Sequence, residues 1–212
     1  MNKIAVFGAS GRTGKSFTEL ALKNGYEVKA LVRDSSRLSF QHPNLQVIQG
    51  DIYNPSKVEE TINETEAVID LIGPGKGSSS ELQRTATRNI LQAMQQNNVK
   101  RLITLASLPF GIVDPNDKLT FMNRFMMILA KNLMGAMVED ARGHIDLIKQ
   151  SGVDWTVVRA PGLNEQPSQG KYRVGYLDAN TGKSIARGDI AAFMLDELKS
   201  PKYIRQMPLI SN

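Results

Sequence analysis

The sequence contains no cysteine. Disulfide bonds, thiolate metal ligands and cysteine nucleophiles are therefore excluded. The two histidines, His42 and His144, stand too far apart to fit the ligand spacing of a zinc site, so we expect no bound metal. The first apolar stretch follows Lys3 and is too short for the hydrophobic part of a signal peptide, so we expect a cytoplasmic protein.

Aromatic residues are also scarce, at 6% of the chain, although the net charge is +5. Nucleic-acid-binding proteins gather their cations into a patch, whereas the cations here are spread along the chain, and we expect no nucleic-acid partner. A positive cleft for anionic small molecules would explain the charge equally well. With 212 residues, 41% of them hydrophobic, and no repeat or linker, we expect a single domain over residues 1–212.

The most informative stretch is a glycine-rich turn near the start, residues 8–14, with the sequence GASGRTG. It follows an apolar run at residues 4–7 and precedes residues 15–23, whose apolar positions have helical spacing. In a strand–turn–helix unit that binds a dinucleotide, Gly8 allows the sharp turn, Gly11 the approach of a pyrophosphate, and Gly14 the close packing of the helix. Free N–H groups at the helix start point at the anion. Further hydrogen bonds and charge would come from Ser10, Arg12 and Thr13.

The next apolar run, residues 27–32, predicts a second strand, and Arg33 and Arg37 follow it. An acid at the end of this strand favours NAD, whereas an arginine accommodates the 2′-phosphate of NADP. Asp34 lies one position too late, so we predict NADP as the cofactor. The alternative is that both arginines are solvated loop charges.

Two further strand ends are candidates for the rest of the cofactor. Residues 45–49 form a third predicted strand, after which Asp51 can accept a hydrogen bond from the adenine amino group and Ile52 can pack on its ring; Asp51 could equally cap the following turn. Residues 67–72 form a fourth strand, which ends before a polar, glycine-rich loop at residues 73–80. Such a loop lies at the edge where open α/β sheets bind ligands, or is a plain surface loop.

Strands and helices alternate through most of the chain, which predicts an α/β fold with a doubly wound parallel sheet of Rossmann type and a small C-terminal region on the substrate side. The later predicted strands are residues 102–106, which deliver Ser107 to the ligand edge, and residues 155–158, with a small hairpin at 171–177. The remaining helices are predicted at residues 55–63, 81–97, 140–150 and, capped by Gly188 and Asp189, up to Leu198.

Residues 119–138 are apolar and rich in methionine, but Arg124 and Lys131 interrupt them and argue against a membrane span. We favour a helix packed on the core. The alternatives are a flexible helical wall over a substrate cleft and, because the polar face carries few cations, less readily a helix on a membrane surface.

The motifs together resemble a known family. The turn at 8–14, the LVRDSSRL stretch at 31–38, Gly50-Asp51, Ala106-Ser107, Ser151-Gly152, the RAPG stretch at 159–162, GKY at 170–172 and IARGDI at 185–190 are similar to atypical short-chain dehydrogenases/reductases. Within them the chain most resembles the NAD(P)H-binding, NmrA-like group that contains flavin reductase (biliverdin-IXβ reductase). The resemblance covers nearly the whole chain.

The resemblance implies roles for individual residues. The pyrophosphate would be held by Gly8, Ser10, Gly11, Arg12 and Thr13, the 2′-phosphate by Arg33 and Arg37, adenine by Asp51 and Ile52, the ribose by Ile72 and Gly73, and the nicotinamide by Ser107 and Pro161.

Two positions depart from the pattern. Carbonyl-reducing relatives use a Tyr-x-x-x-Lys pair as general acid, and the matching positions here are Met137 and Ala141. The histidine of biliverdin-reducing relatives is replaced by Gly162.

We therefore predict an NADPH-dependent reductase of a flavin or a similar conjugated small molecule, with Ser107 orienting the nicotinamide or the acceptor. The alternative is an NmrA-like sensor that binds the cofactor without turnover; a nucleotide-sugar epimerase fits less well, because the larger C-terminal region and the catalytic pair are missing. We expect a monomer.

Overall fold

The computed structural model describes residues 2–38, 40–75 and 77–212. Its main sheet has the strand order β3-β2-β1-β4-β5-β6-β10-β8. The strands are β1 (Lys3–Phe7), β2 (Glu27–Val32), β3 (Leu45–Gln49), β4 (Ala67–Asp70), β5 (Arg101–Ser107), β6 (Asp154–Ala160), β8 (Arg173–Gly175) and β10 (Leu209–Ser211). All pairings are parallel except that of β8 with β10.

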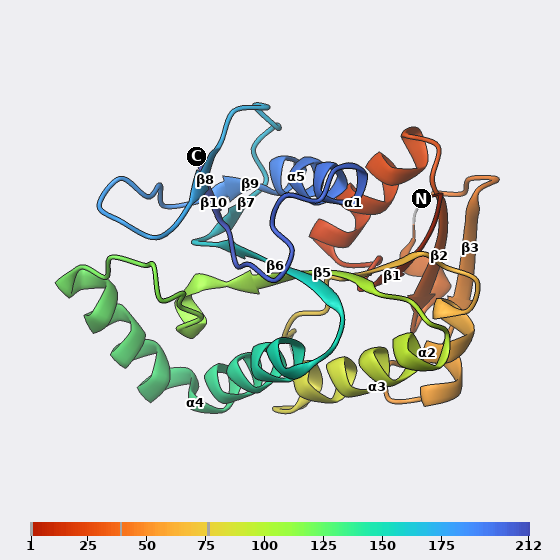
Figure 1. Ribbon diagram of the computed structural model, residues 1–212, viewed down its shortest axis with the longest axis horizontal. Coiled ribbons are helices and arrows are strands. Elements are labelled where there is room, and N and C mark those ends of the chain that lie inside the picture. The colour runs from red at the N-terminus through yellow and green to blue at the C-terminus, as the bar shows by residue number, and fades with distance from the viewer. Residues whose placement is uncertain (1, 39, 76) are drawn as a thin grey trace.

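Helices cover both faces of this sheet, with α1 and α5 on one face and α2, α3 and α4 on the other (Figure 1). Their bounds are α1 (Arg12–Lys23), α2 (Pro55–Ile62), α3 (Leu82–Gln96), α4 (Phe121–Gln150) and α5 (Arg187–Lys199), with short 3-10 turns η1 (Ser35–Arg37) and η2 (Leu108–Phe110). The predicted doubly wound Rossmann-type sheet is confirmed.

Alternation along the central strand divides the core in two. Ile4 and Val6 of β1 belong to the cluster under α1 and α5, and Ala5 and Phe7 to the cluster under α2, α3 and α4. Side chains of a strand point alternately to the two faces, so a strand covered on both faces is apolar throughout. This is why the continuous apolar run at residues 4–7 predicted a buried strand correctly.

The fourth strand is shorter than predicted. It ends at Asp70, whose carboxylate accepts a hydrogen bond from the Ile72 backbone N–H at 3.0 Å. This local bond turns the chain away from the ladder, so Ile72 lies in the loop beyond the sheet.

The C-terminal region differs most from the sequence prediction. Residues 171–177 form no hairpin of their own; β8 pairs antiparallel with β10, a strand that the sequence did not predict. A second small sheet joins β7 (Leu163–Asn164) and β9 (Ile185–Ala186). Asp189 does not cap α5: it is buried in the first turn and accepts hydrogen bonds from the Ser168 hydroxyl and the backbone of Gly170.

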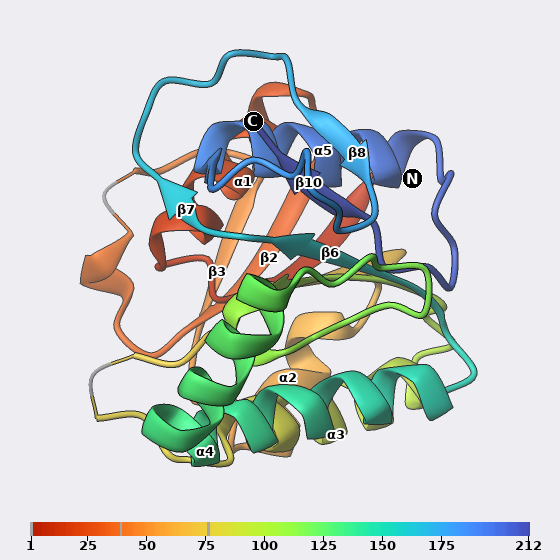
Figure 2. The same ribbon diagram turned by 90° about the vertical axis from the view of Figure 1, so that its left-hand side faces the viewer.

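Helix α4 is also different from the prediction, because residues 121–150, which join most of the stretch 119–138 to the predicted helix at 140–150, form one helix with a kink at Met134 (φ −134°, ψ 33°). Its second half lies along α3, whereas its first half turns away from it (Figure 2). The expectation that the first half packs on the core is wrong, since most of its apolar side chains are exposed. In the part of the chain that the structure describes, no helix is long and apolar enough to cross a membrane.

Candidate functional site: a groove at the carboxyl ends of the strands

The strand order reverses between β1 and β4, and open α/β sheets bind ligands outside the carboxyl ends of their strands at such a point. Two adjoining cavities of about 450 and 290 Å³ lie there. Both are lined by Gly11, Leu71, Ile72 and Gly73, so they form one groove that crosses the end of β1. We call the larger cavity the adenine side and the smaller one the nicotinamide side, after the parts of a dinucleotide that they suit.

The glycine-rich turn forms the middle of the groove. Gly8 has φ +80°, and a Cβ there would lie 2.6 Å from the Leu71 carbonyl oxygen; a Cβ at Gly14 would lie 2.0 Å from the Gly8 carbonyl oxygen. Gly11 is the N-cap of α1, yet no side chain caps this helix and its first turn holds no acid. The N–H groups there are thus available to an anion, and the turn fits a pyrophosphate.

On the adenine side, both predicted arginines line the cavity and are exposed. Asp34, the acid that could bind a ribose hydroxyl, is already engaged: its carboxylate accepts hydrogen bonds from the backbone N–H and the hydroxyl of Ser36 at the start of η1. Both hydrogen bonds lower the pKa of Asp34, and the bond from the Ser36 hydroxyl has the larger effect. The arrangement leaves Arg33 and Arg37 as the charges that a 2′-phosphate would meet.

Asp51 and Ile52 line the same cavity. The Asp51 carboxylate also accepts a hydrogen bond from the Tyr53 backbone N–H at 3.0 Å, so it does cap the turn before α2, as the alternative expected. The loop at residues 73–80 borders the groove with Gly75, Gly77, Ser78 and Ser79. Lys76 of that loop lies outside the described residues.

On the nicotinamide side, Ser107 ends β5 and lines the cavity, and its hydroxyl makes no hydrogen bond with another described residue. Ala141, the position that corresponds to the lysine of the Tyr-Lys pair, lines the same cavity. Pro161 is not among the lining residues, although its neighbours Ala160 and Gly162 are. Ser107 is therefore the predicted residue best placed beside a nicotinamide.

The sequence prediction did not include Arg187, the first residue of α5, which lines the nicotinamide side. Its guanidinium donates to the Glu165 carboxylate (2.8 Å) and to the Thr13 hydroxyl (3.3 Å), and Arg12 reaches the same carboxylate oxygen at 3.1 Å. The hydrogen bond from Arg187 lowers the pKa of Glu165. Two cations thus converge beside the open end of α1.

His144 of α4 lies under the nicotinamide side and is 1% exposed. The Thr87 hydroxyl donates to the Gln83 carbonyl oxygen, so it accepts from Nδ1–H of His144 at 2.5 Å, and Nε2 is left as an acceptor toward Thr104. Burial lowers the pKa of His144 to about 4, although Asp140 opposes this. At neutral pH the imidazole is uncharged and has no proton to donate from Nε2.

α4 is fixed against this side of the groove by Asp140. Its two carboxylate oxygens accept hydrogen bonds from the backbone N–H groups of Gln83 and Arg84, at 2.8 and 2.9 Å, in the first turn of α3. A carboxylate at a helix start satisfies free N–H groups and suits the helix dipole. This contact sets where Ala141 and His144 lie.

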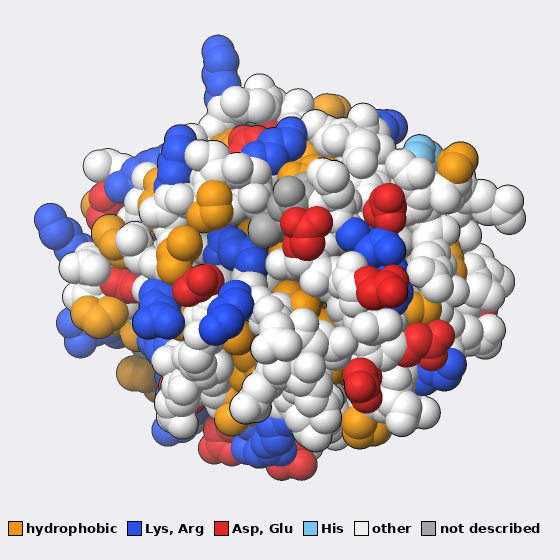
Figure 3. All heavy atoms as spheres, turned by 45° about the vertical axis from the view of Figure 1, so that its right-hand side comes forward, with side chains coloured by type: hydrophobic (Ala, Val, Ile, Leu, Met, Phe, Trp, Pro, Cys, Tyr) orange, Lys and Arg blue, Asp and Glu red, His pale blue; other side chains and the backbone are white. Residues whose placement is uncertain are grey.

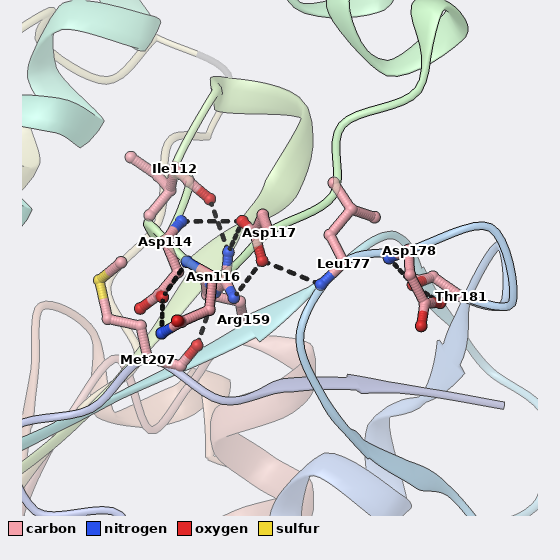
Figure 4. Close-up of polar contacts among 9 residues, drawn as sticks. All are labelled: Ile112, Asp114, Asn116, Asp117, Arg159, Leu177, Asp178, Thr181 and Met207. Carbon is pink, nitrogen blue, oxygen red and sulfur yellow. Dashed lines mark hydrogen bonds and ion pairs between the residues drawn. The ribbon is translucent and has the colours of Figure 1, made fainter.

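A buried ion pair lies behind the lining of the nicotinamide side, because its arginine donates to the carbonyl oxygen of Ile112, a residue that lines this cavity (Figure 4). Arg159, at the end of β6, is fully buried and donates from two nitrogens to the two carboxylate oxygens of Asp117. It also donates to the carbonyl oxygens of Met207 and Ile112, while Asp117 accepts from the Leu177 backbone N–H. The pair therefore joins the loop after β5 to β6 and to the segments around β8 and β10.

Among the described residues, no group of histidine and acidic side chains could hold a metal ion. Cations and acids are interspersed over the face shown in Figure 3, and no field of one sign covers it. That no nucleic acid binds stays a prediction.

The glycine turn, the open start of α1 and the position of the groove define a Rossmann-type dinucleotide-binding protein. The model of the NAD(P)H-binding family matches residues 8–201, and the chain belongs to this family, as the resemblance of its motifs to the atypical short-chain dehydrogenases/reductases indicated.

Similar sequences are found in plants and bacteria. An uncharacterised chloroplastic protein of Arabidopsis thaliana is 29% identical over 92% of this chain and 71% of its own length. YwnB of Bacillus subtilis, also uncharacterised, is 24% identical over 95% of this chain and 94% of its own. Since one relative is chloroplastic, the cytoplasmic location of this chain stays a prediction.

Solved structures share the fold. A short-chain dehydrogenase/reductase from Veillonella parvula in complex with NADP superposes with a TM-score of 0.79 at 17% identity, covering 100% of this chain and 94% of the other. ChuY from Escherichia coli O157:H7, described as an anaerobilin reductase, superposes with a TM-score of 0.79 at 20% identity, covering 99% and 97%.

Proposed function

We propose that this protein is an NADPH-dependent reductase that transfers hydride to a flavin or to a similar flat, conjugated acceptor. One observation carries the proposal: among the described residues, those that line the nicotinamide side of the groove include no aspartate, glutamate, tyrosine or lysine that could act as general acid. Met137 and Ala141 replace the Tyr-Lys pair, and His144 is neutral. Flavins and quinones can take their proton from water, so an acceptor of this kind needs only positioning.

NADP is the cofactor that the adenine side supports better than NAD. Arg33 and Arg37 line it, and Asp34, the acid that could bind a ribose 2′-hydroxyl, is engaged by Ser36. Arginine pairs with phosphate through charge-assisted hydrogen bonds. The NADP complex of the structurally similar Veillonella protein agrees with this choice.

The chain's own residues have defined tasks in this proposal. When bound, NADPH would supply the hydride. Its pyrophosphate would be held by the backbone N–H groups at the start of α1, together with Ser10, Arg12, Thr13 and Arg187. Its ribose would lie beside Ile72 and Gly73. Ser107 orients the nicotinamide amide or the acceptor through its free hydroxyl. The described residues place no imidazole base on that hydroxyl, so Ser107 does not act as a nucleophile.

The name of ChuY, an anaerobilin reductase, supports an acceptor with an extended conjugated system. Gly162 replaces the histidine of biliverdin-reducing relatives, which argues for a different member of that chemical class.

An NmrA-like sensor is the second candidate, because the same absence of a Tyr-Lys pair would suit a protein that binds NADP(H) without turnover. NADPH binding alone does not separate the two functions. Consumption of NADPH does.

The test is NADPH oxidation, followed by absorbance, with FMN, FAD, riboflavin and a simple quinone. Arg33→Ala should raise KM for NADPH about tenfold, the effect of one lost charged hydrogen bond, and leave KM for NADH unchanged. Arg88→Ala, at an exposed position of α3, is the control and should behave as wild type. Tight NADPH binding without consumption by any acceptor would refute the reductase and support the sensor.

A further inference from the structure

The first half of α4 carries the largest group of exposed apolar side chains in the described part of the chain. Nine of the fourteen large hydrophobic residues found exposed there lie between Phe121 and Met137. Phe121 is 84% exposed and Leu133 is 74% exposed. We call the exposed apolar side chains from Phe121 to Met137 the α4 apolar face. Contiguous apolar surface of this kind marks an interaction site.

The exposed side chains share one side of the helix. At 100° per residue, Phe121, Phe125, Ile128, Leu129 and Leu133 fall within about 140° of the circumference, and the exposed Met122, Met126 and Met137 widen this to about half of the helix. The opposite side is held to the protein by Met127, which with Leu119 packs against the small cluster of Leu108, Leu177 and Leu209. The apolar face therefore points outward and is not the side that contacts the fold.

Within the stretch that carries this face the charged residues have one sign, and the next acid along the helix is the exposed Glu139. The stretch from Lys118 to Val138 contains Lys118, Arg124 and Lys131 and no acidic residue. All three cations are exposed, and none forms an ion pair with another residue that the structure describes. Arg124 and Lys131 are seven residues apart, so they lie on one line along the flank of the apolar face.

We propose that the α4 apolar face docks on an anionic lipid surface, with its apolar side chains in the headgroup boundary and Lys118, Arg124 and Lys131 at the lipid phosphates. The sequence disfavoured this alternative because the polar face of the helix carries few cations, but the structure exposes the apolar face and places Arg124 and Lys131 beside it, as in amphipathic helices that bind membranes. Long basic side chains can keep their charge in water while their stems lie on apolar surface.

The charges argue against a second copy as the partner. Two antiparallel copies of this helix, centred near Ile128, would bring Arg124 of each close to Lys131 of the other. No acid between residues 118 and 138 could neutralise them, and like charges across an interface cost affinity.

The docking surface adjoins the groove. Met127 packs against the cluster that contains Leu108, the residue directly after Ser107, and the second half of the same helix lines the nicotinamide side with Ala141. Binding would thus bring the nicotinamide side next to the lipid. The docking itself does not depend on the proposed reductase activity.

Flotation of the protein with vesicles tests the proposal without cofactor or substrate. We expect binding to phosphatidylcholine vesicles that contain about one third phosphatidylserine, weaker binding to pure phosphatidylcholine, and release by salt. Arg124→Gln combined with Lys131→Gln should weaken binding about 30-fold, because each cation near an anionic lipid surface raises the affinity about fivefold. Phe125→Ser combined with Leu133→Ser should abolish it.

Ile204→Ser is the matched control, because Ile204 is another exposed apolar residue, outside α4, and this variant should bind as wild type does. All substituted positions are exposed, and unchanged melting temperatures will show that the variants fold. Absence of binding to anionic vesicles would overturn the proposal. So would a dimer in sedimentation that the Phe125/Leu133 variant dissociates, since the face would then be an interface between copies.

Discussion

The buried ion pair of Asp117 and Arg159 allows a quantitative test of what stabilises the protein next to the nicotinamide side of the groove. In Asp117→Asn the buried guanidinium loses its counter-charge and one strong acceptor. Removing one partner of a buried ion pair costs about 3–5 kcal/mol, and we take about 3 kcal/mol because asparagine keeps one acceptor oxygen. For a chain of this size each kcal/mol shifts the melting temperature by about 2–4 °C, so we expect a decrease of about 6–12 °C.

A second ion pair of the same chemistry serves as the control. Arg173 and Asp178 also form a two-point contact, but their side chains are 39% and 29% exposed. Exposed pairs contribute about 1 kcal/mol or less, so Asp178→Asn should lower the melting temperature by about 4 °C at most. Thermal unfolding followed by circular dichroism measures both. Equal effects of the two substitutions would refute the argument that burial makes the Arg159 pair important.

The pH dependence of the same pair has a definite sign. Burial alone would raise the pKa of Asp117, but the hydrogen bonds from Arg159 and from backbone N–H groups outweigh it and lower the pKa. A carboxyl group whose pKa is lower in the folded than in the unfolded protein stabilises the fold fully when the pH is above its unfolded-state pKa. It loses this contribution as the pH falls through its folded-state pKa. The difference between wild type and Asp117→Asn should therefore persist at pH 5 and close only in stronger acid.

Three other substitutions test the groove. Gly14→Ala would place a Cβ 2.0 Å from the Gly8 carbonyl oxygen and should abolish dinucleotide binding in calorimetry, whereas Gly135→Ala, which meets no atom within 4 Å, should not. Arg187→Gln should raise Kd for NADPH about tenfold, through loss of a charged hydrogen bond beside the pyrophosphate site; an unchanged Kd would exclude Arg187 from that site. Burial raises the pKa of Asp70 to about 7, despite the hydrogen bond from Ile72, so its contribution to stability is lost as pH rises through 7. Asp70→Asn should raise the free energy of unfolding in urea by about 4 kcal/mol at pH 8.5, since the folded and unfolded pKa values differ by about three units, but by only about 1–2 kcal/mol at pH 5, between these two pKa values; equal effects at both pH values would contradict this.

The dinucleotide half of the protein could be predicted from the sequence because its determinants are local. Gly8, Gly11 and Gly14 follow a buried strand and open a helix, and Arg33 stands directly after the next strand. Parallel strands bring their carboxyl ends to one edge, so the order of elements already places these residues near one another.

Only the tertiary structure revealed the contacts between distant segments. Arg187 meets Thr13 across 174 residues, Asp140 caps the start of α3, and Asp117 neutralises Arg159. A charged residue in a sequence does not identify its partner, because the attraction depends on distances that folding alone sets.

The methionine-rich first half of α4 is a second case in which the sequence could not determine the packing. The apolar, methionine-rich sequence of residues 119–138 predicted a helix, but an apolar stripe does not state what covers it. The kink at Met134 turns the first half of α4 away from α3 and leaves its apolar face exposed. The sequence by itself determined the strand–helix order and the cofactor turn, since both depend on neighbouring residues; which charges pair and which apolar face stays open was decided only when the chain folded, because both depend on the packing of segments far apart in the chain.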